Sequence, residues 1–261
     1  MRLMVTCLEC AAENVGSKAD ITHWVDLQDD DAYVGTCKNG HSVQFTLDNL
    51  RYEILYQSGI VALLFGFYRE AVSSIAVATE RFFEFASRAM LIHHGVEPAV
   101  VEEAWKHVKK QSQRQLGAFQ FLYAATLRKP FREGKSRVTF DEQMSFRNNI
   151  IHLGELPPRE EVVDYARYTF ELIREIWANI NAVVPSALQQ ARDQLVSQGR
   201  AKVESKSRVT LPLGRGVRWY RMVLADLADI SMDFNARVKI TEETVFLWGL
   251  PQIATPGNNA T

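Results

Sequence analysis

Cysteine is scarce in this 261-residue sequence, and long apolar runs are missing from it. The longest apolar run, at residues 60–67, falls well short of the ~18 residues that a membrane-spanning helix needs. Three cysteines, an odd number, do not make a disulfide framework, and the first residues lack the apolar core of a secretory signal. We therefore expect a cytoplasmic protein with no membrane partner.

An excess of one charge is also lacking, because 30 basic residues balance 31 acidic residues. Contact with nucleic acid would therefore need a local basic patch. The sequence has neither the phosphate-binding Gly-x4-Gly-Lys loop nor the Gly-x-Ser-x-Gly nucleophile elbow. Two basic clusters are candidates for an RNA track, although such clusters are more often solvated faces: Lys106, Lys109, Lys110 and Arg114, and Arg128, Lys129, Arg132, Lys135 and Arg137.

Three zones divide the chain. Residues 1–48 contain all three cysteines, residues 49–185 have long helical patterns, and residues 186–261 mix one polar helix with strand-like runs. In the middle zone apolar residues recur every three or four positions, which predicts helices over residues 54–67, 68–93, 99–123, 141–153 and 158–184. The expected fold class is mainly α, an antiparallel bundle of four to five helices.

The last zone is expected to form a small α+β extension. Its patterns predict helices over residues 186–198 and 219–230, and strands at residues 209–211, 238–240 and 245–248. Basic and aromatic residues alternate near residue 219, which suits stacking on single-stranded bases, although Trp219 also fits an apolar core. These residues are Arg215, Arg218, Trp219, Tyr220 and Arg221.

The cysteines fall into a metal-ligand pattern. Cys7 and Cys10 form a Cys-x2-Cys pair, and Cys37 and His41 form a Cys-x3-His pair after it. Two close pairs on tight turns supply the four tetrahedral ligands that structural Zn²⁺ prefers. The pattern resembles the knuckles of a zinc ribbon, and it leaves no cysteine for nucleophilic catalysis. His23 is an alternative fourth ligand, and three unrelated buried thiols are the alternative to a metal site.

A second candidate site lies at the end of the helix predicted over residues 141–153, where Arg147, Asn148 and His152 stand close in sequence. RNA can be cleaved without metal when its 2′-hydroxyl attacks the phosphate, a reaction that needs a general base and a general acid. Histidine can serve either role near neutral pH, and arginine offers a planar fork of donors to phosphate oxygens. Asn148 can donate to phosphate or orient His152, which follows it by one helical turn.

Arg147 and His152, four residues apart with a polar residue after the arginine, resemble the motif of the HEPN superfamily, and the order of helices over residues 50–185 is similar too. The resemblance implies a helical bundle that dimerises and places two motif helices face to face around one composite site. It implies a metal-independent endoribonuclease acting in phage defence or as a toxin, with RNA as substrate and a protein partner or antitoxin. Other members of the superfamily are non-catalytic.

Helical geometry bears on this site. Residues five apart on a regular α-helix lie ~140° apart around the axis, so Arg147 and His152 do not project in parallel. A two-fold homodimer would bring two copies of each around one phosphate. Glu80, on the helix predicted over residues 68–93, is a candidate to orient Arg147, and a solvated helix residue is the alternative. Alternatively, Arg147 pairs on the surface with Glu142 or Glu155. The alternative function is a non-catalytic module that binds protein or nucleic acid through the zinc ribbon and the C-terminal extension.

Overall fold

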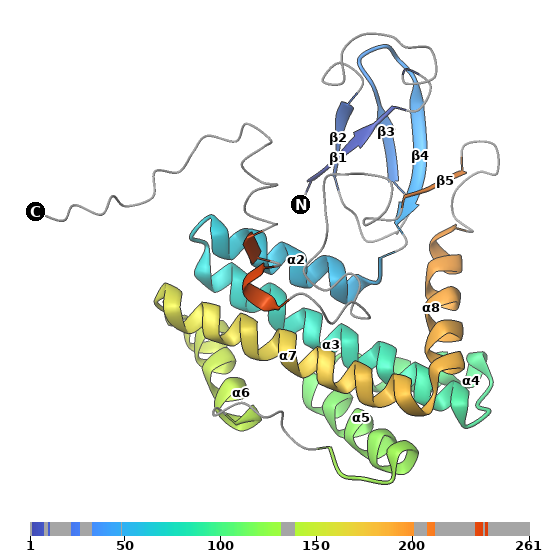
Figure 1. The fold of residues 1–261 in the computed structure, drawn as a ribbon, viewed down its shortest axis with the longest axis vertical. Coiled ribbons are helices and arrows are strands. Elements are labelled where there is room, and N and C mark those ends of the chain that lie inside the picture. Colours follow the sequence, from blue (N-terminus) through green and yellow to red (C-terminus); the bar gives the residue numbers. More distant parts are fainter. Residues whose placement is uncertain are drawn as a thin grey trace, which may run out of the picture.

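The computed structural model describes residues 2–7, 10, 22–26, 33–47, 49–131, 139–200, 208–211, 233–236 and 238–239. It is mainly helical with a few short strands, as the sequence predicts (Figure 1). None of its described helices is both long enough and apolar enough to cross a membrane.

The helices occupy the middle of the chain. Their bounds are α2 Arg51–Leu64, α3 Tyr68–His93, α4 Pro98–Val108, α5 Ser112–Leu127, α6 Phe140–Asn148, the π-helical turn η1 Asn149–Leu153, α7 Arg159–Val183 and α8 Pro185–Arg200. The predicted bounds of α3 are confirmed. The single helix predicted over residues 99–123 is wrong, because the chain breaks into α4 and α5 at residues 109–111. Those three residues are polar and offer no apolar side chain to bury, and Gln111 is extended.

Helix α3 is the centre of the core. It packs against α2, α5, α7 and α8, and its side chains Ile75, Phe82 and Met90 are fully buried. Helix α2 approaches α3 closely at Gly59, where a Cβ atom would lie only 2.5 Å from the Ile75 side chain. This close approach explains a glycine inside a helix, where it would otherwise be unfavourable.

Helix α8 joins the same core. Ala187, Leu188 and Ala191 are buried in the cluster that α3 and α7 form. The helix predicted over residues 186–198 is confirmed, and it rises beside the bundle toward the strands (Figure 1). The predicted zone boundaries at residues 48 and 185 stay predictions.

The strands form two small sheets. β1 (Arg2–Thr6) pairs antiparallel with β2 (Thr22–Asp26). β3 (Tyr33–Thr36) pairs antiparallel with β4 (Ser42–Leu47), and β4 pairs in parallel with β5 (Arg208–Leu211). The strand predicted at residues 209–211 is therefore confirmed, and it lies in the same sheet as β3 and β4.

Of the other elements predicted in the C-terminal extension, one is wrong and two fall on residues that the structure does not describe. Residues 238–239 are helical, so the strand predicted at residues 238–240 is wrong. Val238 packs against the main core, which a short helical turn achieves with one apolar side chain. The helix predicted over residues 219–230 and the strand predicted at residues 245–248 lie outside the described residues.

Candidate functional site

The four predicted metal ligands meet at one point. The ligand atoms of Cys7, Cys10, Cys37 and His41 all lie within 4.8 Å of one another, and the three cysteines are buried. Cys10 Sγ lies 3.7 Å from Cys37 Sγ and 3.2 Å from His41 Nδ1. The fourth ligand atom of this cluster comes from His41, and the side chain of the alternative ligand His23 lies outside the described part of the structure.

The spacing of these atoms suits zinc. Zinc–sulfur bonds of ~2.3 Å at tetrahedral angles place two sulfurs about 3.8 Å apart, close to the observed Cys10–Cys37 separation. The turn that carries the second pair is tight: the Gly40 amide donates to the Cys37 carbonyl at 3.0 Å, and Gly40 has φ +84°. Asn39 Nδ2 donates to Cys10 Sγ at 3.2 Å, the kind of contact that steadies a metal-bound thiolate.

Helix α6 carries Arg147 in its last turn. Thr139 caps this helix, because its side chain accepts from the Glu142 amide while the Glu142 carboxylate accepts from the Thr139 amide at 2.7 Å. This capping box fixes where α6 begins. It also occupies Glu142, so the surface pair considered between Arg147 and Glu142 does not form.

Arg147 is held from two sides. Its guanidinium forms an ion pair with Glu80 of α3 at 2.8 Å and donates to Asn148 Oδ1 at 2.9 Å. The predicted contact with Glu80 is confirmed, whereas the side-chain bond of Asn148 goes to Arg147. Arginine has five N–H donors, so these two bonds leave others for a phosphate. The guanidinium is therefore fixed in place and keeps further N–H donors for a phosphate.

The surroundings of this pair are half-buried. Burial raises the pKa of Glu80, although the charges of Arg147 and Arg81 act in the opposite direction. Burial also raises the pKa of Tyr165 on α7, which therefore stays protonated at neutral pH. Glu80, Arg147 and Tyr165 line a cavity of about 40 Å³. That space suits a water molecule and is too small for a nucleotide, so a substrate would meet Arg147 from the surface.

A π-helical turn follows Arg147 and Asn148. Across Asn149–Leu153 the backbone bonds reach one residue further than in an α-helix, and the Gly154 amide donates to the Asn149 carbonyl. Arg147 lies in α6 before this wider turn and His152 lies within it, so the ~140° separation of a regular α-helix applies to only part of the segment between them. Gly154 ends the turn in the left-handed region, with φ +76°. Such turns are frequent at functional sites.

His152 lies at the surface beside apolar side chains. Its side chain is exposed and makes no hydrogen bond or ion pair with any residue that the structure describes. Leu153 and Leu156 beside it are 73% and 84% exposed, while Ile150 in the same turn is buried and anchors it. The exposed imidazole and leucines form one continuous surface segment of the chain.

The basic clusters have separate outcomes. Lys106, Lys109, Lys110 and Arg114 are exposed around the α4–α5 junction. Lys106 pairs with Glu103, and Lys129 of the second cluster donates to Asn179. Other members of these candidate RNA-binding groups lie outside the described residues: Arg132, Lys135, Arg137, Arg215, Arg218, Trp219, Tyr220 and Arg221.

Sequence reasoning missed Tyr165 as a neighbour of Arg147. Tyr165 has the apolar spacing of α7, and only the packing of α7 on α3 brings it beside Glu80 and Arg147. Comparison of the chain with family models, curated proteins and solved structures gave no match.

If Arg147 serves in RNA cleavage, as the HEPN resemblance implies, Glu80→Gln is expected to lower that cleavage by about tenfold, because Arg147 loses the charge that fixes its position. Stability should not fall with it. Burial raises the pKa of Glu80, so the free energy of unfolding decreases as the pH rises through that raised pKa, and glutamine removes this loss. Denaturant unfolding and a cleavage assay, each compared with the exposed control Glu155→Gln, measure the two effects. Equal cleavage by both variants would contradict a positioning role for Glu80.

Proposed function

We propose that this chain is a metal-independent endoribonuclease of the HEPN type, with Arg147, Asn148 and His152 as its catalytic residues. The observation that carries the proposal is the fixed Arg147 guanidinium, held by Glu80 and Asn148, immediately before a π-helical turn that presents an exposed histidine. The antiparallel HEPN-like arrangement of the helices belongs to the same proposal.

The proposed reaction breaks one bond of the RNA backbone. A histidine removes the proton of the 2′-hydroxyl, the 2′-oxygen attacks phosphorus, and the bond from phosphorus to the 5′-oxygen breaks as that oxygen gains a proton. The products are a 2′,3′-cyclic phosphate and a 5′-hydroxyl. Arg147 stabilises the negative charge that builds up on the phosphate oxygens.

One chain supplies one histidine of the motif, His152, to the proposed site, whereas the reaction needs both a general base and a general acid. We therefore propose that two copies pair through the surface that includes Leu153 and Leu156 and form a composite site. Exposed apolar side chains beside His152 support this arrangement, because burying them against a second copy would also place two imidazoles together. The proposed protein is a cytoplasmic homodimer that takes RNA as substrate and serves in phage defence or as a toxin with a protein antitoxin.

Zinc is the proposed ion of the four-residue cluster. Three thiolates and one imidazole fill a tetrahedral site and leave no open position for substrate, so the metal would hold the N-terminal strands together rather than take part in cleavage.

Purified protein is expected to cleave total RNA in EDTA and to leave 2′,3′-cyclic phosphate ends. The zinc content of the protein is followed through the assay, because loss of the structural metal is a separate effect. End-group analysis by mass spectrometry distinguishes these products from the 3′-hydroxyl ends that metal-dependent nucleases produce. Cleavage that stops at once in EDTA while zinc stays bound would overturn the proposed chemistry.

A non-catalytic binding module is the second candidate. It is favoured by one observation: no described residue orients the imidazole of His152, so a single chain does not fix the group that the reaction requires. This candidate predicts that RNA or protein binds without strand scission, which the same assay detects.

A further inference from the structure

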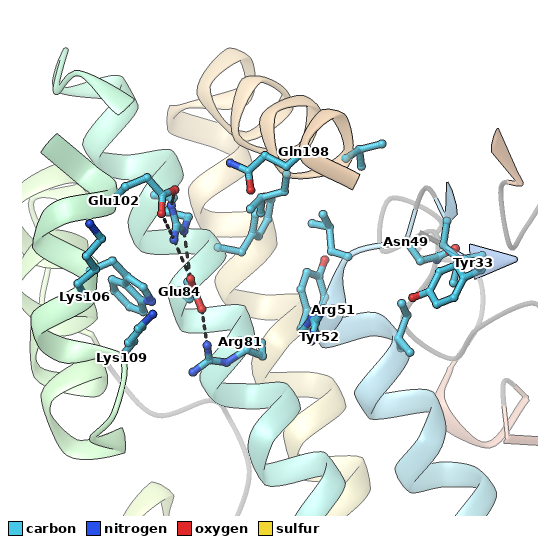
Figure 2. A pocket seen from close by; sticks show the side chains of 18 residues that line it. Tyr33, Asn49, Arg51, Tyr52, Arg81, Glu84, Glu102, Lys106, Lys109 and Gln198 are labelled. Carbon is cyan, nitrogen blue, oxygen red and sulfur yellow. Dashed lines mark hydrogen bonds and ion pairs between the residues drawn. The ribbon is translucent and has the colours of Figure 1, made fainter. Parts of the chain in front are cut away.

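A cavity of about 380 Å³ lies between the N-terminal strands and the helices, away from the cavity beside Arg147. Its walls come from β3 and β4, from α2 and α3, and from α4 and α8. In Figure 2 the side chains of Lys106 and Lys109 lie on one side of the cavity, and those of Tyr33 and Asn49 on the other. A space of this size falls within the ~300–1,000 Å³ typical of small-molecule sites.

The lining has an excess of positive charge. Five cationic side chains and two carboxylates contribute to it: Arg51, Arg81, Arg88, Lys106 and Lys109, and Glu84 and Glu102. Glu84 bridges Arg81 at 2.6 Å and Arg88 at 2.8 Å, and Arg88 also pairs with Glu102 (Figure 2). The ion pairs order the arginines but do not neutralise the lining, which favours an anion.

Two buried donors in this lining lack an acceptor. Trp105 Nε1 and Arg81 Nε have no hydrogen-bond partner in the part of the chain that the structure describes. Trp105 is only 5% exposed. A buried donor without an acceptor destabilises the fold, so each is a place where a ligand oxygen would stabilise the protein.

Aromatic rings complete the cavity. Tyr52, Phe85 and Trp105 line it, and the Arg88 guanidinium lies 5.9 Å from the centre of the Trp105 ring. The space exceeds what a phosphate group alone requires, and the rings offer apolar contact to a planar group. We propose that this cavity binds a free nucleoside phosphate, with its phosphate toward the cations and its base among the rings. The site is independent of RNA cleavage at Arg147.

The zinc-loaded full chain, without RNA, is titrated calorimetrically with ribonucleoside mono- and triphosphates, with nucleosides and with inorganic phosphate. At least one nucleoside phosphate is expected to bind at least tenfold more tightly than its nucleoside and than phosphate. Lys109→Glu should weaken that binding tenfold or more. The matched control Lys110→Glu changes the neighbouring exposed lysine, which does not line the cavity, and should bind as the wild type does.

Trp105→Phe keeps a six-membered aromatic ring and removes the unpaired donor together with the five-membered ring that carries it. It is expected to weaken nucleotide binding several-fold in a ligand-free protein that still unfolds cooperatively, which thermal unfolding checks. The proposal is overturned if no nucleoside phosphate binds, if inorganic phosphate binds as tightly, if the two lysine variants behave alike, or if Trp105→Phe binds as the wild type does. RNA cleavage by the same preparations reports separately on the Arg147 site.

Discussion

RNA cleavage is expected to fall by about 10²- to 10⁴-fold in His152→Ala, which is the contribution typical of a general acid or base. The side chain is exposed and makes no hydrogen bond within the described residues, so the substitution removes no packing and no polar contact. The melting temperature should therefore match that of the wild type, and the proposed dimer should persist through Leu153 and Leu156. Single-turnover cleavage of a labelled RNA, thermal unfolding and light scattering make the three measurements.

His107→Ala is the matched control for this variant. His107 lies on α4, and its side chain is 79% exposed, so alanine there removes another exposed imidazole from a different helix of the protein. Cleavage should be unchanged in this control. Undiminished cleavage in His152→Ala, or an equal loss in both variants, would remove His152 from the mechanism and favour the binding-module candidate.

Removal of the metal is expected to unfold the N-terminal strands and to leave the helices intact. Structural zinc contributes about 10–16 kcal/mol of apparent binding free energy in small zinc domains, and an N-terminal zone of this length is too small to bury a large core of its own. The helical core around α3 has its own buried cluster and does not depend on the ion. Chelation should therefore leave most of the helical circular dichroism and open residues 2–47 to proteolysis.

Cys37→Ser makes the same test without a chelator. It should bind less than one zinc per chain by elemental analysis and show the same proteolysis pattern, because serine is a poor zinc ligand. Lys38→Ala, a change at the exposed neighbouring residue, should keep one zinc and resist cleavage. A full complement of zinc in Cys37→Ser, or protease resistance after complete chelation, would contradict the proposed metal site.

Local patterns predicted a large part of this structure. The bounds of α3 follow from apolar side chains that recur every three or four residues, and the Cys7, Cys10, Cys37 and His41 cluster follows from two short spacings. Glu80 was a candidate partner of Arg147 from its place on the long helix, with a solvated helix residue as the alternative, and the structure forms this ion pair at 2.8 Å.

Features that depend on less regular structure were missed. A π-helical turn has no repeating pattern in sequence, so η1 was expected to continue α6 as an ordinary helix. The break between α4 and α5 follows from three polar residues whose effect depends on what the neighbouring turns can bury. The cavity beside Trp105 needs Tyr33, Arg81 and Leu195 to meet from distant parts of the chain, which no local pattern reports.

The pairing of β4 with β5 has a consequence for how the protein is made. Arg208 pairs with Gln44 in parallel, and the whole helical bundle is synthesised between them. The ribosome releases β3 and β4 early, yet the outer edge of β4 receives its partner only after α8 has emerged. During that interval an open strand edge is exposed to pairing with other chains. The sheet of β3, β4 and β5 is therefore completed late in the synthesis of the chain, after the helices have emerged.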